Sequence, residues 1–209
     1  MALDELLLES ASEIGGPILR FYELTEPAVT FGYFQKFAEI QRLTNLRPLI
    51  RRPTGGGLVP HDADWTYSLV FPPGAAWYHL KAIESYERVH QWLQAAFEAL
   101  GVATELSAGA VSQATGQCFI GAERFDLTWQ GRKIAGAAQR RTRQGLLVQG
   151  SIQPPAPLSK SNWQKALCEA ASEQWTVQWQ PLEWQPAFDE RVRTLAEGKY
   201  GARQYNERR

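Results

Sequence analysis

Cysteine is scarce in this sequence, and its scarcity excludes one class of fold. The two cysteines, Cys118 and Cys168, are too few for a disulfide framework, so a small secreted domain held together by disulfides is excluded. Both thiols are expected to be free, as in a reducing compartment. Cys168 stands beside Leu167 in a helical pattern and is expected to lie in the core. Cys118 is then available for chemistry.

The sequence also lacks an excess of charge and a long hydrophobic run. Lys and Arg number 22, Asp and Glu number 22, and a net charge of +0 argues against nucleic acid or an anionic membrane as the main partner. No apolar run approaches the roughly 18 residues of a membrane helix, and residues 1–10 lack the charged start of a signal peptide. We therefore expect a cytoplasmic protein.

Histidine is rare as well, and the three histidines do not form a metal motif. His79 and His90 flank a predicted helix without a third ligand at metal spacing, so we expect no metal site there. The third, His61, follows a glycine-rich stretch.

What is present suffices for one folded domain. The chain has 209 residues, 44% of them hydrophobic, which is enough to bury a core, and no repeat or long linker divides it. We expect a single domain over residues 1–209.

Hydrophobic spacing predicts alternating helices and short strands. Strands are expected at 18–22, 28–32, 49–52, 66–71, 125–129, 133–138 and 146–152, each rich in β-favouring residues. Helices are expected at the N-terminus, from Ile83 to Leu100 with Gly101 ending it, after Ser159 as N-cap, and from Phe188 to near Gly198. The Gln130–Gly131 turn joins two of the strands as a hairpin. The pattern favours an α+β fold with largely antiparallel sheets.

The first candidate site is a loop of glycines that follows two arginines. Its candidate residues are Arg51, Arg52, Thr54, Gly55, Gly56 and Gly57. Adjacent glycines let backbone N–H groups approach a ligand, and arginine supplies forked donors for a phosphate or carboxylate. The alternative is a flexible hairpin tip with solvated arginines. It is not a P-loop, because no Gly-Lys-Ser/Thr follows.

The second candidate is a lysine within a strand of small and apolar residues. Lys133 precedes Gly136 and Ala137, and a buried ammonium ion there requires an anionic partner. It is a candidate for holding a carboxylate, a phosphate or a developing oxyanion, with room beside it for an apolar chain. The alternative is an edge-strand lysine that points to water.

Taken together, these segments resemble the lipoate-protein ligase and octanoyltransferase superfamily, which is related in fold to the biotin-protein ligases and to class II aminoacyl-tRNA synthetases. The family motifs are an Arg-Arg-x-Ser/Thr-Gly-Gly loop, a following His-Asp, a Gly-x-Lys-x-x-Gly-x-Ala-Gln strand and a Gly-Ser/Thr-Ile/Leu strand. This chain has them in that order at 51–57, 61–62, 131–139 and 150–152. Residues 1–5 and 199–209 also look like the beginning and the closing stretch of the family's catalytic domain.

The resemblance implies a site and its partners. The loop would line a lipoyl or octanoyl pocket together with His61, Gly136, Ala137, Gln149 and Gly150, and Lys133 would contact the acyl carbonyl or an acyl-adenylate. The implied partners are an acyl carrier protein and a lipoyl-domain acceptor, such as the glycine cleavage H protein or a 2-oxoacid dehydrogenase E2.

Two mechanisms are compatible with this resemblance. A ligase activates free lipoate with ATP and Mg²⁺, whereas a transferase takes the acyl group from a carrier thioester onto a cysteine and needs no cofactor. Cys118-Phe119, which precedes Lys133 by 15 positions, resembles the cysteine-dependent octanoyltransferases, as do Thr66-Tyr67-Ser68 and the absence of a C-terminal accessory domain. A passive cysteine is the alternative reading of Cys118. Gly57, a ligase-type third glycine, points to a ligase.

One departure from the family concerns the residue before Gly150. The family usually has histidine there and this chain has Gln149, which can hydrogen-bond but cannot titrate near neutral pH. A proton-transfer role at that position is lost or passes to His61, and a non-catalytic acyl-binding homologue is the third hypothesis. The basic run of Arg140, Arg141 and Arg143 would suit an acidic carrier protein, or is a solvated loop.

Overall fold

A six-stranded antiparallel sheet forms the centre of the protein. The computed structural model describes residues 1–109, 121–155 and 158–208. The strand order is β1-β5-β9-β8-β7-β6. Its strands are β1 (Ile18–Tyr22), β5 (Trp65–Phe71), β6 (Glu105–Leu106), β7 (Leu127–Trp129), β8 (Arg132–Thr142) and β9 (Gly145–Ile152).

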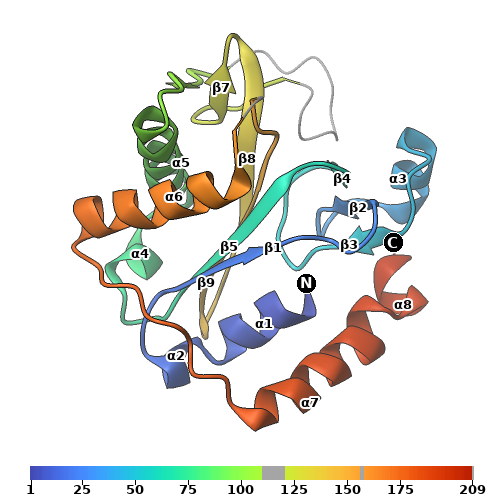
Figure 1. Cartoon of the computed structure of the whole chain (residues 1–209). Helices are drawn as coiled ribbons and strands as arrows, with labels where there is room; N and C mark the ends of the chain where they lie inside the picture. The colour runs from blue at the N-terminus through green and yellow to red at the C-terminus, as the bar shows by residue number, and fades with distance from the viewer. Residues whose placement is uncertain (110–120, 156–157, 209) are drawn as a thin grey trace.

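Helices cover both faces of this sheet (Figure 1). The helices are α1 (Ala2–Glu9), α2 (Ala11–Ile14), α4 (Ala76–His79), α5 (Ala82–Ala99) and α6 (Lys160–Trp175). Along β5, Tyr67 and Leu69 pack in the main core with α5 and α6, whereas Val70 packs on the opposite face against α1 and α2. Every residue of β5 is buried, because successive side chains point to opposite faces and both faces are covered.

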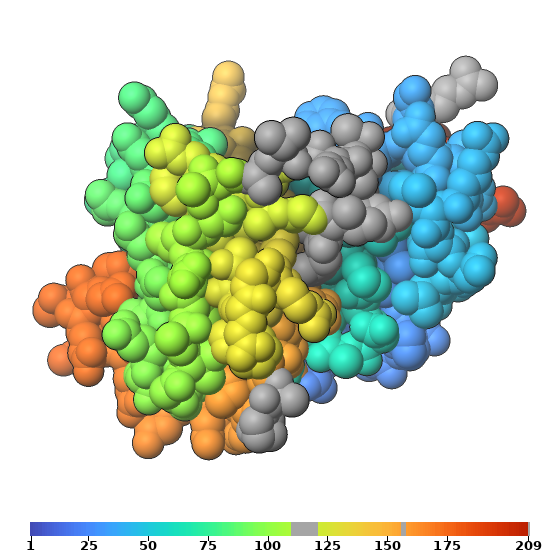
Figure 2. All heavy atoms as spheres, turned by 90° about the horizontal axis from the view of Figure 1, so that it is seen from above, coloured from blue at the N-terminus to red at the C-terminus, as the bar shows by residue number. Residues whose placement is uncertain are grey.

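A second sheet of three strands lies beside the first. It contains β2 (Ala28–Phe31), which pairs in parallel with β3 (Leu49–Arg51) and antiparallel with β4 (Val59–His61). Helix α3 (Phe37–Leu43) buries Ile40 against this small sheet. Seen from above, the part of the chain with α3, in light blue, lies at one side of the molecule, and the part with β7, in yellow, lies near the middle (Figure 2).

The C-terminal segment returns to the N-terminus and to the small sheet. Helix α7 (Pro186–Leu195) packs against α1 and continues as a π-helical turn, η1 (Ala196–Tyr200). In η1, Lys199 Nζ lies 2.6 Å from Glu5 Oε1 of α1. The last helix, α8 (Arg203–Asn206), lies against β3 (Figure 1).

The α+β class and the antiparallel hairpins predicted from the sequence are confirmed. Ser159 caps α6 as predicted, its Oγ accepting the backbone N–H of Asn162 at 3.2 Å. The prediction that Cys168 lies in the core is wrong, since it is only partly buried on the edge of α6. The helix predicted from Phe188 to near Gly198 begins at Pro186 as α7 and ends at Tyr200 as η1. No helix among the described residues is long and apolar enough to cross a membrane.

Candidate functional site

A cavity lies between the two sheets and gathers six of the predicted site residues. These are Arg52, His61, Gly136, Ala137, Gln149 and Gly150. The other lining residues are Met1, Tyr22, Thr30, Val59, Ala138 and Ser151. The cavity holds about 340 Å³ of empty space, part of it open to solvent. One wall comes from β2 and β4 and the facing wall from β8 and β9.

The glycine loop begins with four buried residues, Arg51 to Thr54, and becomes exposed at Gly56. Arg51 and Arg52 are 1% and 5% exposed, which excludes a tip with solvated arginines. Gly56 has a φ of +83°, a conformation that L side chains rarely adopt. Its carbonyl oxygen lies so close to Gly32 that a Cβ on Gly32 would collide with it. Gly56 and Gly32 therefore allow the loop to pack against the end of β2, and Gly32 lies outside the predicted motif.

The Arg51 side chain is occupied by the protein itself. Its guanidinium donates five hydrogen bonds to main-chain carbonyl oxygens, at 2.6 to 3.2 Å. The acceptors belong to Tyr33, Gln35, Tyr205, Asn206 and Arg208. Burial lowers the pKa of Arg51 from its ordinary value. The geometry makes Arg51 an anchor for the C-terminal segment, and direct contact with a substrate stays a prediction.

Arg52 instead begins a chain of hydrogen bonds that ends in the cavity wall. Its Nη1 donates to Thr30 Oγ1 at 2.8 Å, and Thr30 Oγ1 lies 2.7 Å from His61 Nε2. His61 Nδ1 lies 2.8 Å from Asp64 Oδ2, and a carboxylate can only accept, so Nδ1 carries a proton. In the neutral ring, Nε2 then accepts from the Thr30 hydroxyl. Ser151 Oγ also donates to Asp64, at 2.5 Å.

Gln149, which stands where the family usually has histidine, uses both ends of its amide. Its Oε1 accepts from Thr54 of the glycine loop at 2.8 Å, and its Nε2 donates to Asp4 Oδ2 of α1 at 2.7 Å. Asp4 is fully buried and also accepts from Arg20 at 2.6 Å. The amide can donate and accept at once, so Gln149 links the loop to α1 without carrying a charge.

Lys133 is buried and paired, so the reading of an edge lysine pointing to water is excluded. Its side chain is 5% exposed, and Nζ lies 2.7 Å from Asp126 Oδ2, whose side chain is fully buried. A Cβ on Gly136 would lie 3.0 Å from Lys133 Nζ, so the ammonium ion sits over the cavity wall at Gly136. The predicted need for an anionic partner is thereby met within the protein.

A β-bulge aims Lys133 at that wall. Thr128 of β7 pairs with Lys133, but Leu127 pairs with Ala135, so Ile134 is an extra residue in β8. Side chains alternate across a regular strand, and Lys133 would then face away from Gly136. The extra residue brings both onto one face, which is a common use of bulges beside functional sites.

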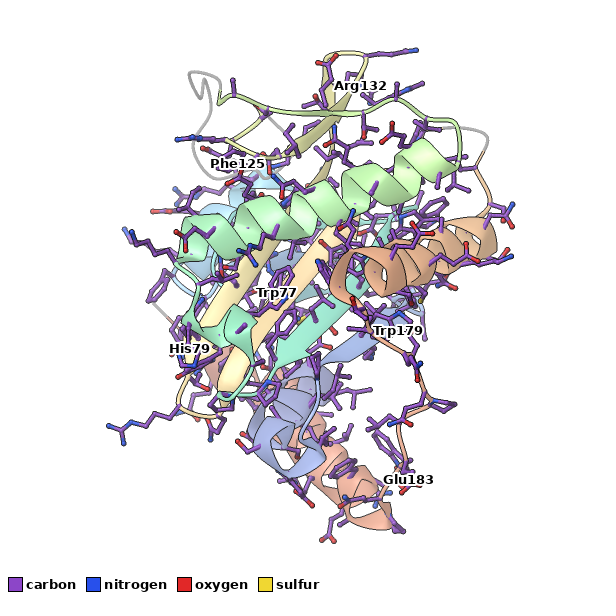
Figure 3. The ribbon with its side chains drawn as sticks, turned by 90° about the vertical axis from the view of Figure 1, so that its left-hand side faces the viewer. Trp77, His79, Phe125, Arg132, Trp179 and Glu183 are labelled. Atoms are coloured by element: carbon purple, nitrogen blue, oxygen red, sulfur yellow. The ribbon has the colours of Figure 1, made fainter. Side chains whose placement is uncertain are left out.

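Two hollows open on the outer side of Lys133. Both are lined by Arg132, Lys133 and Gln153, and one also by Gly121 and Ala122. Figure 3 shows Arg132 at the outer end of the β7–β8 hairpin. The predicted nucleophile, Cys118, lies outside the described residues, so its role stays a prediction. Gly121 follows it by three positions in the sequence.

Several residues of this site were missed from the sequence. The partner of the His61 ring is Asp64, not the adjacent Asp62 of the family motif. Asp126 and Thr30 were also missed. A signal existed for Asp126, since it is a carboxylate within an apolar strand across the hairpin from Lys133, and a buried charge needs a partner. In the part of the chain that is described, no group of three His, Cys, Asp or Glu could hold a metal ion.

Comparison with known proteins gives concordant findings. The model of the lipoyl protein ligase A/B catalytic domain family matches residues 1–174. Octanoyltransferase LipM of Carboxydothermus hydrogenoformans is 37% identical over 160 residues, and that of Geobacillus kaustophilus is 34% identical over 165. Each match covers 73% of this chain and 59% of the relative, so the chain spans about three fifths of the length of these relatives.

Solved structures resemble the whole described fold. A lipoate-protein ligase A bound with ATP superposes with a TM-score of 0.77 at 21% identity, covering 99% of this chain and 92% of that one. A bipartite lipoate protein ligase from Thermoplasma acidophilum gives 0.72 at 18% identity, covering 98% and 91%. At such low identity these likenesses establish the fold alone.

Proposed function

The chain belongs to the lipoyl protein ligase A/B catalytic domain family, and from this premise we propose that it is an acyltransferase. It moves an octanoyl or lipoyl group from a carrier-protein thioester to the lysine of a lipoyl domain, through a thioester on Cys118. The observation that carries the proposal is the Lys133 ammonium ion over Gly136, at the wall of a cavity that Ala137 and Gly150 also line. An acyl chain needs an apolar pocket with a cation near its carbonyl.

The engagement of the basic residues favours a transferase over a ligase. A ligase must hold the triphosphate of ATP, which calls for arginine and lysine donors. Arg51 donates to five carbonyl oxygens, Arg52 donates to Thr30 and to two carbonyls of the loop, and Lys133 pairs with Asp126. A thioester brings no triphosphate and needs only one donor near its carbonyl. The proposed transferase requires no cofactor.

The proposed reaction has two acyl-transfer steps. In the first, the Cys118 thiolate attacks the thioester carbonyl, the new carbon–sulfur bond forms, and the carrier thiolate leaves and takes up a proton. In the second, the acceptor lysine amine attacks the Cys118 thioester, an amide forms, and the Cys118 thiol is regenerated. Lys133 stabilises the oxyanion in both steps. We propose that His61 takes the proton lost by the amine and passes it to the leaving Cys118 sulfur, since Gln149 cannot titrate.

Chain connectivity supports Cys118 as the nucleophile. Gly121 lines the hollow beside Lys133. Cys118 precedes Gly121 by three positions, and three residues of fully extended chain span at most about 11 Å, so the sequence separation is compatible with a nucleophile that serves this hollow. An ammonium ion nearby favours the thiolate.

The proposed partners follow from the two half-reactions. The donor is an acyl carrier protein, and the acceptor is a lipoyl domain such as the glycine cleavage H protein or a 2-oxoacid dehydrogenase E2. The relatives named octanoyltransferase LipM support octanoate as the acyl group. The Thermoplasma acidophilum ligase was studied together with its E2 lipoyl domain, which supports this class of acceptor.

One experiment tests the proposal. The protein is incubated with octanoyl-carrier protein and a lipoyl-domain acceptor without ATP, and both proteins are followed by intact mass spectrometry. We expect a hydroxylamine-sensitive octanoyl adduct on the enzyme and transfer to the acceptor. Cys118→Ala should lose both, whereas Cys168→Ala, the matched control in α6, should keep them.

The other outcomes separate the alternatives. Transfer that survives Cys118→Ala would overturn the covalent mechanism. Modification of the acceptor only with free lipoate and ATP would establish a ligase. Binding of the acyl group without any modification would identify a non-catalytic homologue.

A further inference from the structure

Lys133 cannot by itself fix the direction of its ammonium ion, because its side chain has four rotatable bonds. We propose that Asp126 is the residue that positions Lys133 for the acyl-transfer steps, with Tyr86 of α5 holding Asp126 in place. This inference rests on the proposed function. Nothing in the motifs of the sequence assigns a role to either residue.

The Asp126 carboxylate is held from three directions. Its Oδ2 lies 2.7 Å from Lys133 Nζ and accepts the backbone N–H of Glu123 at 2.6 Å. Its Oδ1 accepts the hydroxyl of Tyr86. Asp126 is fully buried. A carboxylate with both oxygens engaged cannot rotate without losing a hydrogen bond, and a buried one loses it without compensation from water.

Tyr86 is itself fixed on the helix that packs beside this hairpin. Its ring centroid lies 4.2 Å from that of His90, one turn further along α5. Burial lowers the pKa of His90 to about 4, so this neighbour is neutral at pH 7 and adds no charge to the pair. In Figure 3, Phe125, the residue before Asp126, lies close to α5. Asp126, which directly precedes β7, is therefore held by a residue of a helix.

The surroundings of the Asp126–Lys133 ion pair indicate that the pair orients the ammonium ion. Gly136 leaves the space that the ammonium ion occupies, since a Cβ there would lie 2.9 Å from Lys133 Cε and 3.3 Å from Asp126 Oδ1. The bulge at Ile134 turns Lys133 towards that space. A buried ion pair contributes little net stability, so glycine and a bulge at this place are better explained by orientation.

The test is a double-mutant cycle measured as octanoyl transfer from carrier to acceptor. We expect Asp126→Asn to lower kcat by about 10- to 100-fold with little change in KM, the range seen when the group that orients a catalytic ligand is removed. In the Lys133→Met background, Asp126→Asn should cause no further loss, because Asp126 acts only through Lys133. Tyr86→Phe should cause a smaller loss of kcat, and Glu98→Gln, which changes an exposed carboxylate of α5, none.

A second measurement is independent of activity. The Lys133 ammonium signal in ¹⁵N-edited NMR is assigned by its loss in Lys133→Met. It should be sharp in the wild type and in Glu98→Gln, and broadened or shifted in Asp126→Asn. Thermal unfolding of each variant shows whether it is folded. The double variant Asp126→Asn/Lys133→Met removes both buried charges together, so it leaves no unpaired buried charge.

The outcomes distinguish this inference from the proposed function. If the wild type transfers octanoate and Asp126→Asn transfers it equally well, or if the losses of the two single variants multiply, the inference is overturned. If the wild type transfers nothing, the proposed function fails, and the NMR signal still decides. An unchanged Lys133 signal in Asp126→Asn then overturns the positioning role, and a changed one supports it.

Discussion

Three basic side chains of the site have three different tasks, which the residue type alone does not reveal. Arg51 holds main-chain carbonyls, Arg52 organises the cavity wall through Thr30, and Lys133 lies against Gly136 of that wall and pairs with Asp126. The difference follows from what each side chain meets. A planar guanidinium has five donors in fixed directions and can hold several carbonyls, whereas an ammonium ion is a compact point charge.

The first prediction concerns Arg51. Arg51→Met should lower the free energy of unfolding by about 3 kcal/mol, because it leaves five partly buried carbonyl oxygens without their donor. Urea unfolding measures the change, with the exposed Arg203→Met as a control. A variant with unchanged stability and lost acyl transfer would instead show that Arg51 binds substrate directly, as the sequence first indicated.

The second prediction concerns pH and His90. Burial lowers the pKa of His90 from 6.5 to about 4, so the unfolded chain takes up a proton below pH 6.5 that the folded chain rejects. Stability is therefore full above pH 6.5 and is lost as the pH falls towards 4. Between pH 7 and pH 5 this group should cost about 2 kcal/mol.

Comparison with His90→Phe isolates that contribution. Urea unfolding of both proteins at pH 7 and pH 5 should show a smaller decrease for the variant. In the wild type, His90 Nδ1 donates a hydrogen bond to the Tyr86 carbonyl oxygen at 2.9 Å. The variant lacks this bond at both pH values, so its loss does not affect the comparison between them. Equal decreases in the two proteins would mean that His90 is protonated in the folded state.

At the scale of elements, the glycine loop depends on its glycines unequally. A Cβ on Gly55 meets nothing within 4 Å, whereas one on Gly32, at the end of β2, collides with the Gly56 carbonyl. The motif read from the sequence treats the loop glycines as equivalent and omits Gly32, because the contact joins residues that are distant in the chain. Only the packing of the loop on β2 reveals it.

The third prediction compares these two glycines. Gly32→Ala should displace the loop, lower the free energy of unfolding by about 1 to 3 kcal/mol and reduce acyl transfer. Gly55→Ala should leave stability near that of the wild type. Urea unfolding and transfer rates of the two variants measured side by side decide. Equal effects would show that the loop needs its glycines for ligand approach and not for packing.

The elements that sequence periodicity predicts well are those with a regular pattern. The strands 18–22 and 146–152 and the helix from Ile83 to Leu100 are found within one or two residues of the prediction. Strand β8 is longer than predicted, extending to Thr142, because its polar second half has no hydrophobic alternation to mark it. The bulge was missed although Ile134 and Ala135, two buried neighbours, break the alternation. Short elements such as α3 and α8 depend on tertiary contacts and give little local signal.

At the scale of the molecule, the site is formed by segments that are far apart in the sequence. The cavity is formed by β2 and β4 on one side and β8 and β9 on the other, and the Arg51 anchor reaches residues 205–208 near the end of the chain. The sequence motifs identified six of the cavity-lining residues because each motif is local. They did not identify Asp64 or Asp126, which lie close to their partners in sequence but outside the motifs. The role of Arg51 could not be predicted, because it depends on where distant segments meet.

The last prediction concerns residues 175–209, which lie beyond the part matched by the family model. These residues supply the Lys199 partner of Glu5, helix α7 against α1, and three of the carbonyls that Arg51 holds. We expect residues 1–209 to unfold in one cooperative transition, with circular dichroism and tryptophan fluorescence giving the same midpoint in urea. The fragment 1–174 should show a broad, early transition, because α1 and the glycine loop lose their partners. Glu5→Gln in the full chain should shift the midpoint slightly and keep the cooperativity. If the fragment instead unfolds as sharply as the full chain and still transfers octanoate, the C-terminal helices are an appendage and Arg51 is not an anchor.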